Sequence, residues 1–84
     1  MPPGTAETRH RHAVARQFFF VLAGELTIER DEDAFVLRGG EGLEVAPGSA
    51  HQVLNRGDTD ARFLVISQPP SHGDREPAPR AGGA

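Results

Sequence analysis

The sequence predicts an all-β fold, either a sandwich or a barrel of short strands. Segments rich in β-branched and aromatic residues alternate with glycine, proline and acidic turns over residues 7–67. No window shows the 3.6-residue apolar period and the capping residues that mark a helix. At 84 residues, the chain also has room for one domain only. We therefore expect six or seven strands around a single core.

The strongest strand signal is the run of three phenylalanines, a valine and a leucine that follows Gln17. Successive side chains of a strand point to opposite faces, so Gln17 should share one face with Phe19 and Val21. The alternate residues of the run should form the opposite face. The predicted strands, in order, are residues 7–12, 17–22, 25–30, 34–38, 43–46, 51–55 and 61–67, with turns or bends between them.

Composition divides the chain into three parts. Residues 1–5 contain two prolines and a glycine and should form an N-terminal loop, residues 6–67 the barrel, and residues 68–84 a tail. Because prolines and glycines dominate this last part, we expect it to be extended or disordered. Two interpretations of His72 remain. It belongs to this tail, or the surrounding string SHGDR folds back over the mouth of the barrel.

Charge and composition exclude several classes of function. A net charge of −3 and a pI near 5.7 argue against nucleic acid as a partner. We see neither a signal peptide nor an apolar run of the ~20 residues that a membrane span needs, and we expect a cytoplasmic protein. The absence of cysteine excludes disulfides and thiolate zinc sites. A metal ion or self-association therefore remains as support for so small a core.

One residue separates His10 from His12. On an extended strand both imidazoles, together with Thr8, would face the core and could chelate a metal ion. The alternative is a pair of surface histidines between Arg9 and Arg11, because two imidazoles alone bind few metals tightly. A metal site therefore needs further ligands from elsewhere in the chain.

Two spaced motifs resemble those of the cupin superfamily, over about residues 4–67. The first cupin motif has the order glycine, His-x-His, glutamate, glycine, and the second has the order glycine, Pro-x-Gly, histidine, asparagine. Both spacings are met, although a glutamine replaces the glutamate and an alanine replaces the proline. The matching residues are Gly4, His10, His12, Gln17 and Gly24 for the first motif, and Gly40, Ala46, Gly48, His51 and Asn55 for the second.

This resemblance implies a double-stranded β-helix, or jelly-roll, barrel that is short at its N-terminal end. It also implies one divalent transition metal, namely Fe, Mn, Ni, Co, Cu or Zn, held by His10, His12, Gln17 and His51. Glutamine has no carboxylate, but its amide oxygen can still coordinate a metal. Alternatively, Gln17 orients a histidine or a bound ligand through a hydrogen bond.

A small-molecule pocket should lie beside these ligands, with a wall formed by Phe19, Val21, Val53 and Asn55. For Asn55, capping of a turn is the alternative role. The resulting interpretation is a metal-binding small-molecule cupin, either an oxygenase or an isomerase of a small oxygenated compound. A non-catalytic module that binds or senses a metabolite or sugar is the second interpretation, and a structural dimerisation domain is the third.

We also expect a homodimer. Phe18, Phe20 and Leu22 should lie on the strand face opposite Gln17, where a partner chain can cover them. The second sheet or an N-terminal segment could cover the same face instead.

Overall fold

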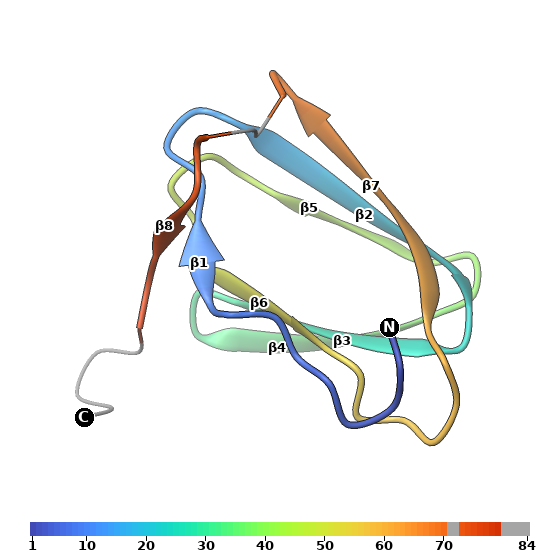
Figure 1. Cartoon of the computed structure of the whole chain (residues 1–84). Helices are drawn as coiled ribbons and strands as arrows, with labels where there is room; N and C mark the ends of the chain where they lie inside the picture. The colour runs from blue at the N-terminus through green and yellow to red at the C-terminus, as the bar shows by residue number, and fades with distance from the viewer. Residues whose placement is uncertain (71–72, 80–84) are drawn as a thin grey trace.

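The computed structural model describes residues 1–70 and 73–79. The described chain is built from β-strands in two facing layers (Figure 1), which confirms the predicted all-β, jelly-roll class. Within the described residues, no helix has the length and the apolar character needed to cross a membrane. The strands are β1 (His10–Arg11), β2 (Arg16–Ala23), β3 (Glu25–Arg30), β4 (Asp33–Arg38), β5 (Gly42–Val45), β6 (His51–Leu54), β7 (Arg62–Gln68) and β8 (Glu76–Pro77).

The two sheets are antiparallel throughout. One has the strand order β4-β3-β6-β1-β8 and the other has the order β5-β2-β7. β1 and β6 are neighbours in the larger sheet, whereas β2 lies at the centre of the smaller one. Both strands that carry motif histidines therefore face the strand that carries Gln17, across the interior.

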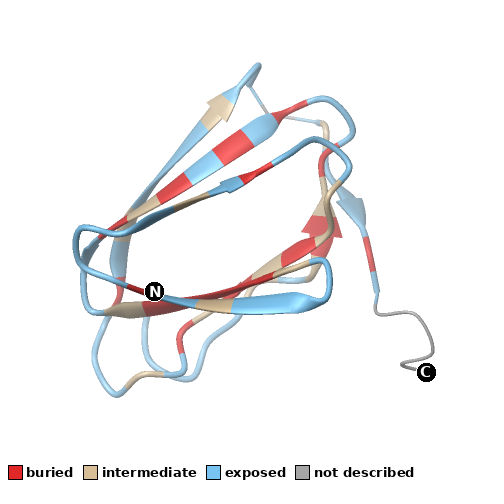
Figure 2. Ribbon diagram, turned by 180° about the vertical axis from the view of Figure 1, so that it is seen from behind, coloured by how far each residue is buried: buried red, intermediate tan, exposed pale blue. Residues whose placement is uncertain are grey.

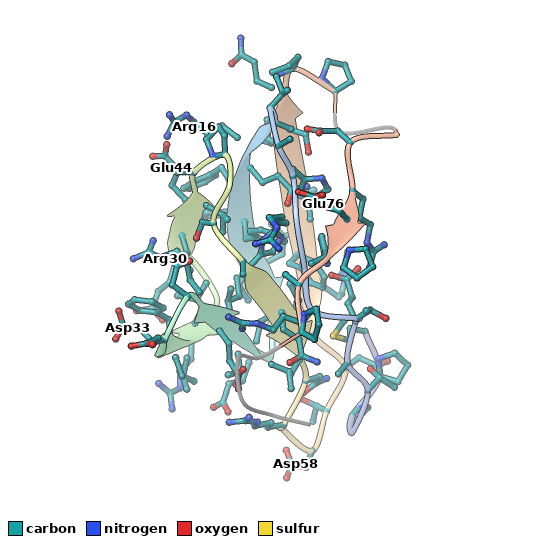
Figure 3. The ribbon with its side chains drawn as sticks, turned by 90° about the vertical axis from the view of Figure 1, so that its left-hand side faces the viewer. Arg16, Arg30, Asp33, Glu44, Asp58 and Glu76 are labelled. Carbon is teal, nitrogen blue, oxygen red and sulfur yellow. The ribbon has the colours of Figure 1, made fainter. Side chains whose placement is uncertain are left out.

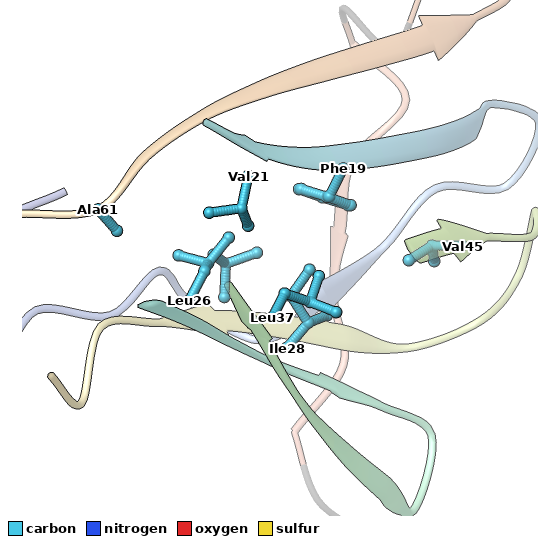
Figure 4. Close-up of a cluster of buried hydrophobic side chains, with 8 residues drawn as sticks. Phe19, Val21, Leu26, Ile28, Leu37, Val45 and Ala61 are labelled. Atoms are coloured by element: carbon cyan, nitrogen blue, oxygen red, sulfur yellow. The ribbon is translucent and has the colours of Figure 1, made fainter. Parts of the chain in front are cut away.

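Alternation along β2 builds one side of the core. Gln17, Phe19 and Val21 are buried, whereas Phe18 and Leu22 are exposed, as the bands along this strand show in Figure 2. The predicted faces of this strand are confirmed. The core is drawn in Figure 4 and consists of Phe19, Val21, Leu26, Ile28, Leu37, Val45, Val53 and Ala61. Burial of each larger aliphatic or aromatic side chain contributes ~1.5–3 kcal/mol.

The first predicted strand, residues 7–12, is much shorter in the structure. Only His10 and Arg11 form β1, and Thr8 is exposed rather than core-facing. The carbonyl oxygen of Thr8 lies 2.7 Å from Nδ1 of His10. A local bond between a side chain and the backbone competes with sheet pairing, so the regular strand begins only at His10. The N–H of Glu7 still donates to the carbonyl of Val53 on β6 at 2.9 Å.

Part of the segment predicted to be a tail is structured. β8 pairs with β1, with His10 opposite Pro77. Glu76, labelled in Figure 3, forms an ion pair with Arg11 at 3.3 Å, and the buried Ala78 donates its N–H to the carbonyl of Arg9. β8 covers the edge that β1 would otherwise leave open. Because its proline lies on the outermost strand, the missing N–H costs no sheet bond.

Candidate metal centre

The fold brings three histidines from two strands into one buried cluster. His10 and His51 lie directly opposite each other in the β1–β6 pair, and His12 follows β1. Their ring centroids are 4.4 Å apart for His10 and His51, 5.0 Å for His10 and His12, and 5.7 Å for His12 and His51. Their ligand atoms all lie within 4.8 Å of one another, a scale similar to the ~4 Å that spans two imidazole nitrogens on one ion. The three side chains are able to hold one metal ion.

Backbone carbonyls determine which ring nitrogen is free. Each Nδ1 lies within hydrogen-bonding distance of a carbonyl oxygen, which can only accept a hydrogen bond. Each Nδ1 therefore donates, and each Nε2 of a neutral ring presents a lone pair, as metal-ligating histidines require. The acceptors are Thr8 for His10 at 2.7 Å, Asp74 for His12 at 2.7 Å and Ser49 for His51 at 3.1 Å.

Two of these Nε2 atoms lack a suitable proton donor. Nε2 of His12 is buried without a hydrogen-bond partner among the described residues. Nε2 of His51 lies 3.1 Å from Oε1 of Gln17, and both atoms are acceptors when Nδ1 holds the proton. A cation between the two atoms would satisfy both of them. A Gln17 side-chain amide with its oxygen and nitrogen exchanged would also satisfy Nε2 of His51. An unpaired buried nitrogen and two facing acceptors fit a divalent transition metal.

Burial keeps the imidazoles of His10 and His51 neutral by lowering their pKa values. Loss of hydration lowers the pKa of His51 to about 4, and the neighbouring charges of His10, His12 and Arg75 act in the same direction. Burial also lowers the pKa of His10, with further contributions from Arg75 and His12. Neutral rings are the form that binds metal, so no proton must leave His10 or His51 at neutral pH.

Gln17 enters the site from the opposite sheet. Its side chain is buried, with Oε1 beside His51 and with Nε2 donating to Oγ of Ser67 at 3.0 Å. The amide oxygen is thus placed beside the histidine cluster, where either of its predicted roles is feasible.

A cavity of about 330 Å³ opens beside the cluster. Phe19 lines it, as expected, together with Phe63 and Val65. Val21 and Val53 lie instead in the hydrophobic core and are not among the residues that line this cavity. Among the described residues, the lining is Glu7, His10, His12, Gln17, Phe19, Phe63, Val65, Gly73 and Arg75.

Asn55 makes the turn after β6 instead of lining the cavity. Its Oδ1 accepts the N–H of Gly57 at 2.9 Å, and its Nδ2 donates to the carbonyl oxygens of Thr59 and Met1, both at 2.8 Å. These are the bonds of a turn-capping residue, the alternative that its position in the second motif left open.

Two glycines explain the spacing of the motifs. Gly48 has φ +81° and donates its N–H to the carbonyl of His12 at 2.7 Å, so the turn before β6 is tied to the first motif. Gly24 has φ +80°, and a Cβ there would lie 2.4 Å from the carbonyl oxygen of Asp60. Neither backbone conformation suits a larger residue.

Sequence reasoning did not assign Glu7, Phe63 and Val65 of the cavity lining, nor any residue of the C-terminal segment that reaches the site. The Asp74 carboxylate accepts the backbone N–H groups of Ala13, Val14 and Ala15 at 3.0, 2.9 and 2.8 Å. The amides of Ala15 and Val14, followed by that of Ala13, hold the pKa of Asp74 below its usual value. Since the Asp74 carbonyl also binds His12, this segment fixes the loop after the His-x-His pair. The only signal was the string SHGDR, in which His72 lies outside the described residues.

Comparison with known proteins agrees with this geometry. The model of the Cupin domain family matches residues 1–67. The polyketide synthase CurC of Streptomyces cyaneus is 32% identical over 69 residues, which cover 82% of this chain and 45% of that protein.

Solved structures give the same result. A sugar phosphate isomerase of the cupin superfamily from Silicibacter pomeroyi has a TM-score of 0.73 at 30% identity, covering 80% of this chain and 45% of that one. A predicted oxalate decarboxylase from Thermotoga maritima has a TM-score of 0.76 at 25% identity, covering 80% and 58%. The chain spans about half the length of these proteins. With a family match over most of its length and both motifs in place, the chain belongs to the cupin superfamily.

Proposed function

We propose that this chain is a metal-binding small-molecule cupin that acts as an oxygenase or isomerase on a small oxygenated compound. The observation that carries the proposal is the convergence of three buried histidines, each with its Nδ1 fixed by a carbonyl, beside a cavity. Gln17 is the proposed fourth ligand. The similar proteins named above concern oxalate, a sugar phosphate and a polyketide, all of which are rich in oxygen.

The proposed chemistry divides between a metal and the cavity walls. A divalent ion, when bound, acts as a Lewis acid on a carbonyl or enolate oxygen. Phe19, Phe63 and Val65 supply an apolar wall. Glu7 places one carboxylate in the same cavity, where it can accept a proton from a substrate carbon or oxygen and return it elsewhere. Proton transfer of this kind favours isomerisation.

A non-catalytic binding module is the second candidate. Apart from the candidate metal ligands, Glu7 is the only carboxylate-bearing residue among the described residues that line the cavity. A cavity with so few acid–base groups also suits simple retention of a metabolite.

Turnover distinguishes the two candidates. Protein loaded with Fe²⁺, Mn²⁺ or Zn²⁺ would be incubated with panels of β-keto acids and sugar phosphates, with oxygen uptake and product formation monitored. We expect turnover with at least one metal, and we expect it to fall at least about 100-fold in Glu7→Gln if Glu7 is the base. Compounds that raise the melting temperature without any turnover would instead support the binding module.

The role of Gln17 can be tested by restoring a carboxylate. We expect Gln17→Glu to raise metal affinity, because the ligand set gains a negative charge at a position that already faces His51. Ser67 can reverse its hydrogen bond and donate to the new carboxylate. Affinity would be measured by competition with a chelator, with the exposed Gln68→Glu as a control for the same change of net charge. Unchanged or weaker affinity in Gln17→Glu would place this residue outside the ligand set.

A further inference from the structure

The candidate metal ligands carry no negative charge. Three neutral imidazoles and an amide leave a divalent ion with its full charge of +2, whereas a glutamate at position 17 would have removed one unit. Of the described residues that line the cavity, two more are charged, Glu7 and Arg75, and their charges cancel each other. A loaded site would therefore carry a net charge of about +2 in a partly buried place, where uncompensated charge is costly. An anionic ligand would neutralise it.

Arg75 is held at the cavity from both sides along the chain. Immediately before it, Asp74 is bound by three backbone N–H groups of the loop that follows His12. Immediately after it, β8 pairs with β1. The backbone of this exposed arginine is therefore anchored, and only its side chain must be ordered when a ligand binds.

Arg75 lines the same cavity as three of the candidate metal ligands, His10, His12 and Gln17. Several other surface arginines form ion pairs, such as Arg11 with Glu76 and Arg38 with Glu25. Among the described residues, no carboxylate forms an ion pair of this kind with Arg75. A guanidinium beside a cavity presents a planar fork that matches a carboxylate.

We propose that Arg75 is a specificity-determining residue, and that it binds a carboxylate group of a small ligand whose other oxygen atoms approach the histidine cluster. The inference rests on the proposed function and deepens it, since it restricts the ligand to a small carboxylic acid. Residues 73–78 lie outside the part of the chain that matches the family model. The selectivity is therefore a feature of this chain's C-terminal segment rather than of the two histidine motifs.

Malonate and its uncharged diamide, malonamide, form a matched pair of probes for this selectivity. Calorimetric titrations would use Zn²⁺-loaded protein, since zinc has no redox chemistry, and metal content would be measured before and after each titration. We expect the wild type to bind malonate more tightly than malonamide. Arg75→Gln should weaken malonate binding by about 10- to 100-fold, because a charge-assisted hydrogen bond is lost. The malonate affinity of Arg75→Lys should fall between those of the wild type and Arg75→Gln. Malonamide affinity should not change in either variant.

Arg62→Gln, which changes an exposed arginine at the start of β7, controls for the loss of net charge and should bind malonate as the wild type does. Equal binding of malonate by the wild type and Arg75→Gln, or equal binding of malonate and malonamide by the wild type, overturns the inference. A wild type that does not retain zinc overturns the proposed metal site instead. In that case, malonate would be titrated into the metal-free wild type and into metal-free Arg75→Gln. Weaker malonate binding by Arg75→Gln would support the role of Arg75, and equal binding would overturn it.

Discussion

Replacement of His51 by alanine is expected to reduce the metal content of the purified protein from one ion per chain to near zero. His51 is 1% exposed and faces His10 across the β1–β6 pair, so its loss removes one of three converging imidazoles. Affinity should fall by more than ~100-fold, because even the loss of a residue that only orients a ligand costs ~10–100-fold. Metal would be quantified by mass spectrometry after dialysis.

Loss of metal must be distinguished from loss of fold. Val53→Ala is the matched control, since Val53 lies two residues further along the same strand, on the same buried face. It should cost ~2 kcal/mol through the cavity it leaves, yet it should retain one ion per chain. Circular dichroism would confirm that both variants are folded. One ion per chain in His51→Ala would show that the metal is held elsewhere.

Light scattering at micromolar concentration is expected to give twice the 9.0 kDa mass of the chain. The outer apolar face of the smaller sheet, defined by Phe18, Phe20, Leu22, Leu64 and Ile66, is the reason. Phe18 lies directly opposite Ile66, and Phe20 opposite Leu64, so these pairs share one side of the sheet. The exposed fractions of Phe18, Leu64 and Ile66 are 40, 50 and 59%.

A partner copy is the simplest cover for this face. Burial of a phenylalanine side chain contributes ~2 kcal/mol, and a two-fold axis counts each such contact twice. β7 is also the last strand of its sheet, with backbone groups on its outer edge available for pairing.

Introduction of a charge into the outer apolar face of the smaller sheet tests the dimer. Ile66→Glu should give the mass of a single chain, because a two-fold axis would bring two new carboxylates into an apolar interface. Val36→Glu is the control, since Val36 is similarly exposed, at 48%, but lies on β4 of the other sheet. A mass of 9.0 kDa for a stable, folded wild type would rule out the dimer and the role assigned to the outer phenylalanines.

Local patterns were sufficient to predict most of the fold. β3 has the predicted bounds, Glu25–Arg30, because strict alternation between two turns leaves little freedom in its register. β2 was recognisable from its aromatic and β-branched residues, and its two faces follow from the two-residue period of a strand. The histidines of the two motifs could be grouped because the motifs resemble those of the cupin superfamily, in which both contribute metal ligands.

Other features depend on residues far apart in the chain. The segment before β1 is held by a distant residue, since the N–H of Glu7 donates to the carbonyl of Val53. Val53 could not be assigned to the core rather than to the cavity wall, because an inward direction is common to both places. That distinction depends on which part of the opposite sheet covers the residue.

The amino-acid sequence by itself determined the strand class and the turns, since each depends on periodicity or composition within a short segment. The resemblance of two motifs to those of cupins indicated the three candidate imidazole ligands. Only the tertiary structure decided which groups complete the site. Asp74 binds His12 across 62 residues of chain, and it brings Arg75 to the cavity that Glu7 lines from near the other end. Such contacts arise because the pairing of β8 with β1 offsets the entropic cost of closing a long loop. Composition alone does not show whether that cost is offset.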